Sequence, residues 1–416
     1  MLQWFSTLSK NEKRTFWACF SGWGLDAMDT QMYALLLPTL IALWGMSKGQ
    51  AGFLGTVVLV FAALGGWMAG ALADRFGRVR ILQLTIIWFS VFTGLSALTH
   101  SFLQLMVTRS LQGLGFGGEW AVGAVLISET INARVRGRVV GAIQAGWAVG
   151  YAIAVLMSTL LFITLPASVA WRVFFLVGVA PALFVVWIQR NIHEAAVFVA
   201  AGEAGARKGG PWEALAAPYR ATMLKGILLT SGIYGGNYVM ITWLPAYLKL
   251  VLNLSIASVG GYLAINIFGS FMGAFLNGWM ADAVGRRKTF IIISGCQALA
   301  VAIYTLAPIN LLATLLLGFV LGMLQSGTAA GTGAFLAELF PTRVRATAQG
   351  ITGNAGRAIG AVMPAIVGIL SAQMRLGAAM GACACASYAI VVTAALQLPE
   401  TRGRDLGAVG IQGYDG

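Results

Sequence analysis

The chain has 416 residues, of which 58% are hydrophobic and only 10% are charged. Because soluble globular domains carry about 25% charged residues, this composition excludes a water-soluble protein and favours one embedded in a membrane. The formal net charge of +13 indicates either a nucleic-acid partner or an uneven distribution of charge across a membrane.

We expect twelve transmembrane helices, because twelve apolar segments long enough to cross the hydrocarbon core follow one another along the chain. These segments are 16–43, 52–73, 80–98, 102–128, 138–163, 171–189, 223–248, 258–281, 288–307, 310–338, 347–371 and 377–397. The prediction is an all-α polytopic protein with an N-terminal six-helix bundle at 1–189, a polar linker at 190–222, a C-terminal six-helix bundle at 223–398 and a tail at 399–416.

The basic residues are distributed unevenly over this arrangement. Of the 27 Lys and Arg, 21 fall on one side of the twelve spans. An excess of Lys and Arg marks the cytoplasmic side of membrane proteins, so we expect both termini in the cytoplasm and the chain in a bacterial inner membrane. The positive charge therefore reports topology, and a nucleic-acid partner is excluded.

The two halves of the sequence resemble each other. GALADRFGRVR at 70–80 recurs as GWMADAVGRRK at 278–288, SETINARVRGRVVG at 128–141 recurs as AELFPTRVRATAQG at 337–350, and Pro38 recurs as Pro245. The offset stays between 207 and 209 residues, which indicates duplication of a six-helix unit. Parallel repeats of this kind are typical of transporters, whose substrate site lies between the repeats.

The motifs carry a family resemblance over nearly the whole chain. G-x-x-x-D-R-x-G-R-x-R at 70–80, TRSLQGLGFGGEW in the fourth span and PETRG at 399–403 resemble landmarks of the major facilitator superfamily. LDAMD, GFGGEW and RNIHEA are similar to the sialate, lactate and related carboxylate:proton symporters, with the aromatic-acid:proton symporters next. One departure is Ala283, which stands in the second signature where a basic residue usually follows the aspartate.

Polar side chains share helical faces in the first and fourth spans. Arg109, Gln112, Phe116 and Glu119 follow i, i+3, i+7, i+10, and Asp26 and Asp29 follow i, i+3. Ionisable groups inside a membrane are functional by default, although a salt bridge from Arg109 to either aspartate is a simpler explanation. Two acids so close cannot both stay ionised cheaply, so we expect Asp26, Asp29 and Glu119 to couple protons while Arg109 switches between them.

The second half holds one central arginine among neutral polar groups. The candidate substrate-binding residues are Gln112, Tyr234, Asn237, Tyr238, Gln325, Asn354 and Arg357. Guanidinium binds a carboxylate through two parallel hydrogen bonds, so an organic anion is the expected ligand of Arg357. The alternative is that helix carbonyl groups cap this side chain.

Charged residues of both signs alternate at the cytoplasmic helix ends. They are Asp74, Arg75, Arg78, Glu129, Arg134 and Arg136 in the first half, and Asp282, Arg286, Glu338, Arg343 and Arg345 in the second. In the superfamily that the chain resembles, such groups form ion pairs that close the inner face. The arginines alone would satisfy the positive-inside rule, but the interleaved acids favour a gate.

The sequence lacks a nucleophile, cofactor or metal-ligand motif, so we expect neither an enzyme nor a cofactor or metal. The prediction is a proton-coupled symporter that takes up a small organic carboxylate by alternating access, and we expect it to be a monomer in the membrane. A proton-driven exporter of drugs or metabolites is the alternative, and a transport-inactive sensor is disfavoured because the gate charges are present. Lactate, pyruvate, a sialic acid, an aromatic acid and a dicarboxylate all stay open as substrates.

Overall fold

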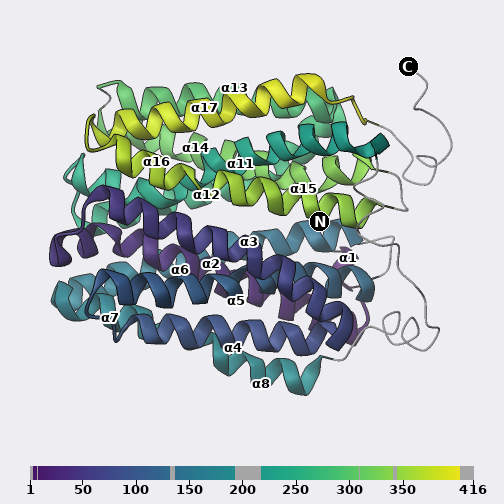
Figure 1. Cartoon of the computed structure of the whole chain (residues 1–416), viewed down its shortest axis with the longest axis horizontal. Helices are drawn as coiled ribbons and strands as arrows, with labels where there is room; N and C mark the ends of the chain where they lie inside the picture. Colours follow the sequence, from purple (N-terminus) through teal and green to yellow (C-terminus); the bar gives the residue numbers. More distant parts are fainter. Residues whose placement is uncertain are drawn as a thin grey trace. The chain divides into compact units, whose positions relative to one another are not determined.

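The computed structural model describes residues 3–6, 8–131, 136–192, 217–308, 310–340 and 344–402, and every regular element in these ranges is an α-helix (Figure 1). The first half contains α1 (Gln3–Ser6), α2 (Lys10–Trp44), α3 (Lys48–Phe76), α4 (Arg78–Ser96), α5 (Phe102–Thr130), α6 (Arg136–Thr164), α7 (Ala167–Val177) and α8 (Pro181–Asn191). The second half contains α11 (Ala217–Leu250), α12 (Ile256–Val284), α13 (Arg286–Leu306), α14 (Leu311–Leu339), α15 (Arg345–Gly360), α16 (Met363–Leu370) and α17 (Leu376–Gln397). The predicted all-α class is confirmed.

Each of the twelve predicted spans coincides with one long helix or with two consecutive shorter ones. Within the described ranges, nine helical segments are long and apolar enough to cross a membrane. The helices outside that group are α2, α5 and α11. These three carry the buried polar residues described below, and their lower hydropathy follows from that content.

The sixth and eleventh spans are broken in the middle. The helix α7 ends at Val177 and α8 begins at Pro181, and α15 ends at Gly360 shortly before Pro364 in the first turn of α16. Proline has no N–H to donate and clashes with the preceding turn, so a helix restarts there more easily than it continues. Arg357 thus lies in the last turn of α15, beside a break rather than inside a continuous helix.

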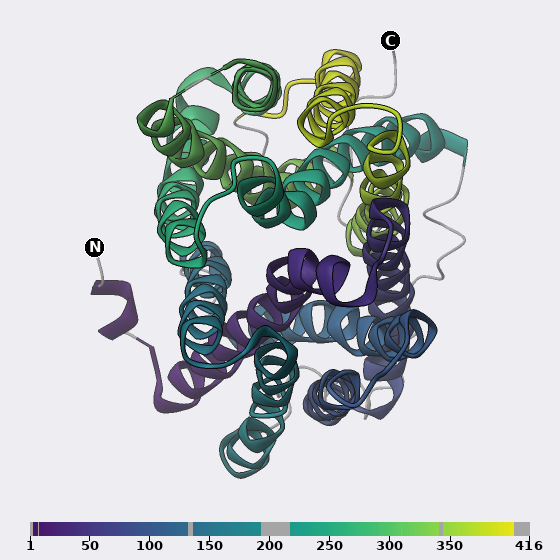
Figure 2. The ribbon, with the colours of Figure 1, turned by 90° about the vertical axis from the view of Figure 1, so that its left-hand side faces the viewer.

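The chain divides into two compact units. Unit 1 comprises Met1–Ala206 and Leu244–Gly261, and unit 2 comprises Arg207–Trp243 and Tyr262–Gly416. Figure 2 shows the long helices of each unit nearly end on, so that the side-by-side packing within each unit is visible. In unit 1 a cluster of buried side chains from six helices forms the core, and it includes Phe16, Phe89, Leu126, Ile143 and Ile188.

The repeated signature loops have the same backbone conformation in both halves. Gly77 ends α3 and Gly285 precedes α13, and both have a φ of 104°. Residues with a Cβ rarely adopt this conformation, so the glycine of each signature is required by the sharp turn between two helices. This agreement supports the duplication inferred from the sequence.

Close helix pairs also recur in the two units. A Cβ at Gly65 of α3 would overlap the backbone of Leu114 in α5, and a Cβ at Gly273 of α12 would overlap the backbone of Met323 in α14. Small residues allow such approach of helix backbones in membranes, where van der Waals packing drives association. The equivalent helices therefore pack by the same means in each unit.

Candidate functional site

Asp29 and Arg109 form a buried ion pair between α2 and α5. Nη1 of Arg109 lies 3.4 Å from Oδ1 of Asp29, and Nη2 donates to the Asp29 carbonyl oxygen at 3.3 Å. The two side chains are 0% and 1% exposed, respectively. Each charge is therefore compensated inside unit 1, as the cost of an isolated charge in a membrane interior requires.

Two neutral donors complete the surroundings of the Asp29 carboxylate. Thr93 of α4 donates its hydroxyl hydrogen to Oδ1 at 2.5 Å, and Gln112 of α5 donates from Nε2 to Oδ2. Both side chains are buried, and hydrogen bonds to an ionised acceptor are stronger than those between neutral groups. Three side chains from two helices thus stabilise the charged form of Asp29.

Arg109 is held from a third direction by an aromatic ring. Its guanidinium carbon lies 5.4 Å from the ring centre of Phe175 in α7, a cation–π contact. Among the described residues its Nε finds no hydrogen-bond partner. The guanidinium is therefore held by the Asp29 carboxylate and the Phe175 ring, while its Nε–H donor is not used by any described residue.

Asp26 and Glu119 form a second buried acidic group on the same two helices. Asp26 is 0% and Glu119 is 2% exposed, and their carboxyl groups lie against each other. Two carboxyl groups buried side by side cannot both stay ionised cheaply, so one of the pair is expected to hold a proton. Gly22 makes room for this pair, since a Cβ there would overlap Oε1 of Glu119.

Arg357 is the central charged residue of unit 2. This side chain is 8% exposed and is the only buried charged one among the described residues of unit 2. Its Nε donates to the hydroxyl oxygen of Tyr238 at 2.9 Å, and its guanidinium carbon lies 6.0 Å from the ring centre of Tyr234. The two tyrosine rings stack with centres 5.7 Å apart and planes 26° apart. A cation thus lies beside a flat aromatic surface.

A neutral polar network occupies the neighbouring helices of unit 2. Gln325 Nε2 donates to the Asn237 carbonyl oxygen at 3.3 Å, and the Tyr388 hydroxyl contacts Oδ1 of Asn237 at 3.5 Å. Gln297 of α13 accepts from the Thr328 hydroxyl of α14 at 3.2 Å. This network offers amide and hydroxyl groups but no further charge.

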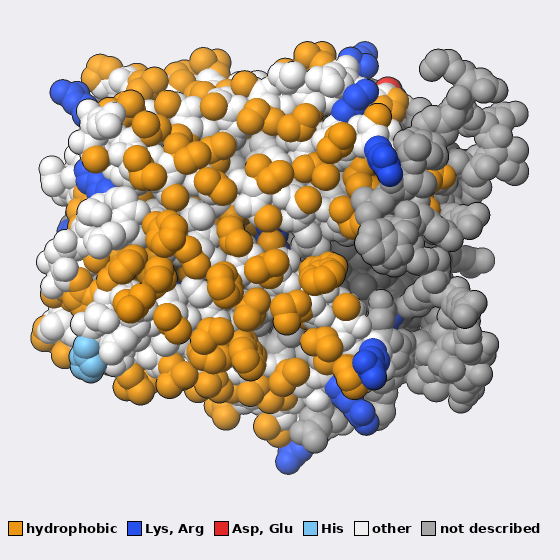
Figure 3. Space-filling view, in the orientation of Figure 1, with side chains coloured by type: hydrophobic (Ala, Val, Ile, Leu, Met, Phe, Trp, Pro, Cys, Tyr) orange, Lys and Arg blue, Asp and Glu red, His pale blue; other side chains and the backbone are white. Residues whose placement is uncertain are grey.

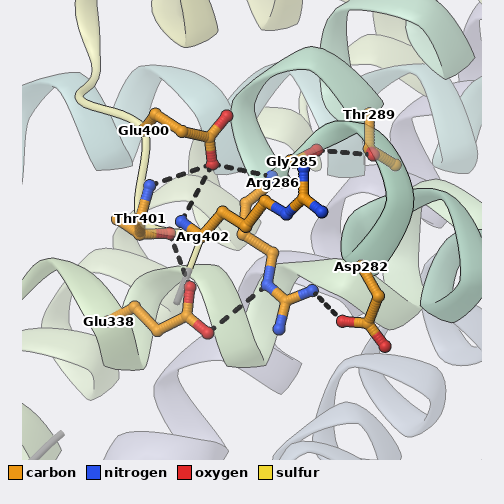
Figure 4. Close-up of polar contacts among 8 residues, drawn as sticks. All are labelled: Asp282, Gly285, Arg286, Thr289, Glu338, Glu400, Thr401 and Arg402. Atoms are coloured by element: carbon orange, nitrogen blue, oxygen red, sulfur yellow. Dashed lines mark hydrogen bonds and ion pairs between the residues drawn. The ribbon is translucent and has the colours of Figure 1, made fainter. Parts of the chain in front are cut away.

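The predicted gate residues of the second half come together in Figure 4. Arg286 Nη1 lies 2.8 Å from Oδ1 of Asp282 and its Nε lies 3.4 Å from Oε1 of Glu338. Thr401 donates its hydroxyl hydrogen to the other oxygen of Glu338 at 2.5 Å. One arginine therefore ties the end of α12 to the end of α14 and, through Glu338, to the segment that follows α17.

The PETRG motif contacts the same signature loop. Glu400 Oε1 accepts the backbone N–H of Arg286 at 2.8 Å, of Thr401 at 3.0 Å and of Arg402 at 3.1 Å (Figure 4). A Cβ at Gly285 would lie 2.8 Å from the carboxyl carbon of Glu400. The N-terminus of α13 is thus capped by an acid from a distant part of the chain. The sequence singled out PETRG but not this role of Glu400.

Fewer gate residues are described in the first half. The side chains of Asp74, Glu129, Arg134, Arg136 and Arg343 lie outside the described residues. Arg75 is exposed, whereas Arg78 is 1% exposed and donates to the carbonyl oxygen of Ala73 at 2.6 Å. Arg345 donates to the carbonyl oxygen of Phe340 at 3.1 Å. The contacts of the predicted gate are therefore visible mainly in unit 2.

Comparison with known proteins identifies the family. The model of the Major Facilitator Superfamily matches residues 19–273 and 252–410. The chain belongs to this superfamily. It is 43% identical over 406 residues (97% of this chain, 94% of the relative) to a "Probable 4-methylmuconolactone transporter" of Cupriavidus pinatubonensis. It is 30% identical to a cis,cis-muconate transport protein of Acinetobacter baylyi (85% and 86% covered) and 25% identical to a sialic acid transporter of Escherichia coli (91% and 92% covered).

Solved structures show the same fold. A xylose transporter of Escherichia coli in a partially occluded inward-open conformation has a TM-score of 0.78 with 17% identity, covering 96% of this chain and 100% of that one. A D-xylose–proton symporter has a TM-score of 0.77 with 19% identity, covering 94% and 99%. The major facilitator chain is therefore a multi-pass transporter of the bacterial inner membrane and not an enzyme.

The structure sorts the predicted residues of this major facilitator chain into groups. Arg109 pairs with Asp29, which resolves the choice between the two aspartates, and Gln112 contacts the same acid. In unit 2 the structure brings Arg357 together with Tyr234 and Tyr238, and Asn354 lies one turn before Arg357 on α15.

Two contacts in unit 1 come from residues that sequence reasoning missed. Thr93 and Phe175 lie in the third and sixth predicted spans, where a threonine or phenylalanine is routine. Spacing along one helix gives no sign of them, because each meets Asp29 or Arg109 only through packing between helices.

Proposed function

We propose that this transporter takes up a small organic monocarboxylate together with one proton, from the periplasm to the cytoplasm. The observation that carries the proposal is the buried Asp26–Glu119 pair, which lies on α2 and α5 beside a separate Asp29–Arg109 ion pair. Relatives whose names state transport of organic acids support the substrate class. The excess of basic residues on one side supports cytoplasmic termini.

Asp29 and the Asp26–Glu119 pair have different roles in this proposal. Asp29 accepts from Arg109, Thr93 and Gln112, so its ionised form is stabilised and it stays charged. Asp26 and Glu119 lie against each other and share one proton in this proposal, which either carboxyl can hold. The coupled proton therefore belongs to Asp26 and Glu119, while Asp29 fixes the arginine.

Arg357 binds the substrate carboxylate in this proposal. Its guanidinium supplies paired donors, and the stacked Tyr234 and Tyr238 supply a flat surface for an unsaturated or ring-shaped body. The neutral network around Asn237 is better suited to an uncharged oxygen-containing group of the substrate than to a second carboxylate. A lactone acid, with one carboxylate and one neutral ring ester, satisfies each of these features, in line with the name of the 43% identical relative.

Charge balance explains why a proton travels with the substrate. Moving one elementary charge against the membrane potential costs about 2.3 kcal/mol per 100 mV. A proton on the Asp26–Glu119 pair cancels the charge of a monocarboxylate, so the loaded carrier moves a neutral cargo. We therefore expect accumulation to follow the pH gradient and to respond little to the membrane potential.

Reconstituted liposomes test the proposal. With 4-methylmuconolactone as the probe, an inward proton gradient should drive accumulation, and a protonophore should abolish it. Asp26→Asn and Glu119→Gln should still exchange labelled substrate across the membrane but should not accumulate it. The control is Glu12→Gln, an acid at the start of α2 that lies outside the buried group and whose capping role glutamine preserves.

Two results would contradict the proposal. Accumulation by both Asp26→Asn and Glu119→Gln at the wild-type level would show that these acids do not carry the proton. Uptake that ignores the pH gradient in the wild-type protein would exclude symport altogether.

A further inference from the structure

Unit 2 has an apolar groove between α11 and α17 that the proposed transport function does not use. Its volume is about 270 Å³, and it is lined by Leu228, Ala389, Ile390, Thr393, Ala394 and Gln397. The two helices are in close contact at Gly232, where a Cβ would lie 2.5 Å from the Ser387 carbonyl oxygen. The groove opens one turn closer to the start of α11 and the end of α17.

The equivalent helices of unit 1 carry aromatic side chains in the corresponding region. At the repeat offset, α2 and α8 correspond to α11 and the second part of α17. There Phe184 and Trp187 stack with ring centres 5.2 Å apart and planes 10° apart, and both pack with Phe20 against the buried core. At the same offset of 208 residues, Val392 and Ala395 of α17 stand where unit 1 has Phe184 and Trp187. The two stacked rings of unit 1 therefore have no aromatic counterpart beside the groove.

Basic residues surround the open end of the groove. Arg287 Nη2 donates to the Leu396 carbonyl oxygen at 2.7 Å, next to the groove residue Gln397. Lys225 precedes Leu228 by three residues and shares its helical face, and Arg220 is exposed one turn earlier. Figure 3 shows Lys and Arg side chains gathered at this end of unit 2, with an apolar surface along the helices.

Acidic side chains do not offset this charge on the two helices. The sequences of α11 and α17 contain no Asp or Glu. The nearby Glu400 accepts through Oε1 from the backbone N–H of Arg286, at the start of α13, and from those of Thr401 and Arg402. A negatively charged group near Lys225 and Arg287 would therefore meet a positive potential.

We propose that this groove binds an anionic phospholipid, with part of one acyl chain between α11 and α17 and the phosphate between Lys225 and Arg287. Apolar walls with polar groups only at one end fit an alkyl chain that continues into a charged head. The volume lies just below the roughly 300–1,000 Å³ of small-molecule sites, as expected for a chain segment alone. The basic end is the one that the charge asymmetry places in the cytoplasmic leaflet, where anionic lipids attract Lys and Arg.

Native mass spectrometry of the full-length protein tests this lipid site. Dioleoylphosphatidylglycerol should bind with higher affinity than zwitterionic dioleoylphosphatidylcholine. In Lys225→Gln/Arg287→Gln the affinity for phosphatidylglycerol should fall by roughly tenfold or more, as expected for two basic residues near an anionic lipid. Ala389→Phe should fill the groove and weaken the binding of phosphatidylglycerol without changing charge.

A matched control removes the same number of charges at the far ends of the two helices that line the groove. Lys249 lies in the last turn of α11 and Arg375 caps the start of α17, both at the end away from the groove. The variant Lys249→Gln/Arg375→Gln should keep the wild-type affinity. Equal affinity for both lipids, or equal losses in the two double variants, would overturn the proposal, and neither result depends on transport activity.

Discussion

The paired helices of the two halves bury opposite chemistry at corresponding positions. At the repeat offset, Asp26 and Asp29 of α2 correspond to Tyr234 and Asn237 of α11, and Glu119 of α5 corresponds to Thr328 of α14. Unit 1 thus buries acids and an arginine, whereas unit 2 buries neutral donors and acceptors around Arg357 alone. The arginines are not equivalent either, because Arg109 lies on the fourth span and Arg357 on the eleventh.

The backbone did not diverge in the same way. Gly77 and Gly285 share one unusual conformation, and Gly65 and Gly273 make the same close approach to a neighbouring helix. Packing between backbones therefore tolerated little change after duplication, while the polar residues changed freely. The comparison supports the proposed division of labour, in which one half handles the proton and the other binds the substrate anion.

The contrast between the two units can be tested by removing one buried charge from unit 1 and one buried neutral group from unit 2, in separate variants. Arg109→Met leaves the Asp29 charge buried without its cation, which should lower the free energy of unfolding by about 3–5 kcal/mol. Asn237→Ala removes a neutral acceptor from Tyr388 and should cost only about 1–3 kcal/mol. Thermal unfolding in detergent measures both, and the double variant Arg109→Met/Asp29→Leu should recover part of the loss. Equal losses in the two single variants would remove the distinction.

The substrate role of the second half can be sharpened at Arg357. Arg357→Lys keeps the charge but loses the planar pair of donors, so binding of 4-methylmuconolactone should weaken by about 1.5–3 kcal/mol. Isothermal titration calorimetry measures this change. Arg345→Lys is the same substitution on the same helix, away from the tyrosine pair, and should bind at wild-type affinity. Wild-type affinity in Arg357→Lys would contradict the proposal that this residue binds the substrate carboxylate.

Because the two halves pack their helices in the same way, alanine substitutions at equivalent glycines should lower the free energy of unfolding by similar amounts. Gly65→Ala and Gly273→Ala would each press a methyl group into a neighbouring backbone, so each should lower the free energy of unfolding by about 1–3 kcal/mol. Gly70 and Gly278 lie on the same helices with open space around a Cβ, and their alanine variants should be neutral or slightly stabilising. A large cost in one half only would show that the close packing is not a common inheritance.

Much of this architecture was accessible from the sequence, because membrane helices must be long and apolar and the signature repeats at a fixed offset. The twelve spans and the superfamily are confirmed. The breaks at Pro181 and Pro364 were not anticipated, because proline within a hydrophobic segment can kink, end or merely occupy a helix, as Pro38 and Pro245 do inside α2 and α11.

The site was predicted less completely than the fold. Helical periodicity placed Arg109, Gln112 and Glu119 on one face, but it cannot tell which neighbouring residue each will meet. The rotation and offset of α2 against α5 decide that Arg109 meets Asp29 and Glu119 meets Asp26. Thr93 reaches Asp29 from a third helix, so only the packed structure reveals it.

The smallest effect is expected at the acids of the repeated signature, Asp74 and Asp282. The Asp282 side chain is 79% exposed, and exposed ion pairs contribute about 0–1 kcal/mol, so Asp282→Asn should hardly change the free energy of unfolding. If the duplication preserved a gate on both sides, Asp74→Asn and Asp282→Asn should both slow transport while leaving substrate binding intact, since they act on the conformational equilibrium. Uptake rates measure transport, binding titrations measure substrate affinity, and cysteine labelling of the inner cavity measures the conformational equilibrium.

Glu338→Gln removes the charge of the carboxylate that contacts both Arg286 and Thr401. It should change the accessibility of the inner cavity more than Asp282→Asn does, because the Glu338 side chain is only 14% exposed. Lost binding with unchanged accessibility in these variants would mean that the signature acids support the substrate pocket and do not close the inner face.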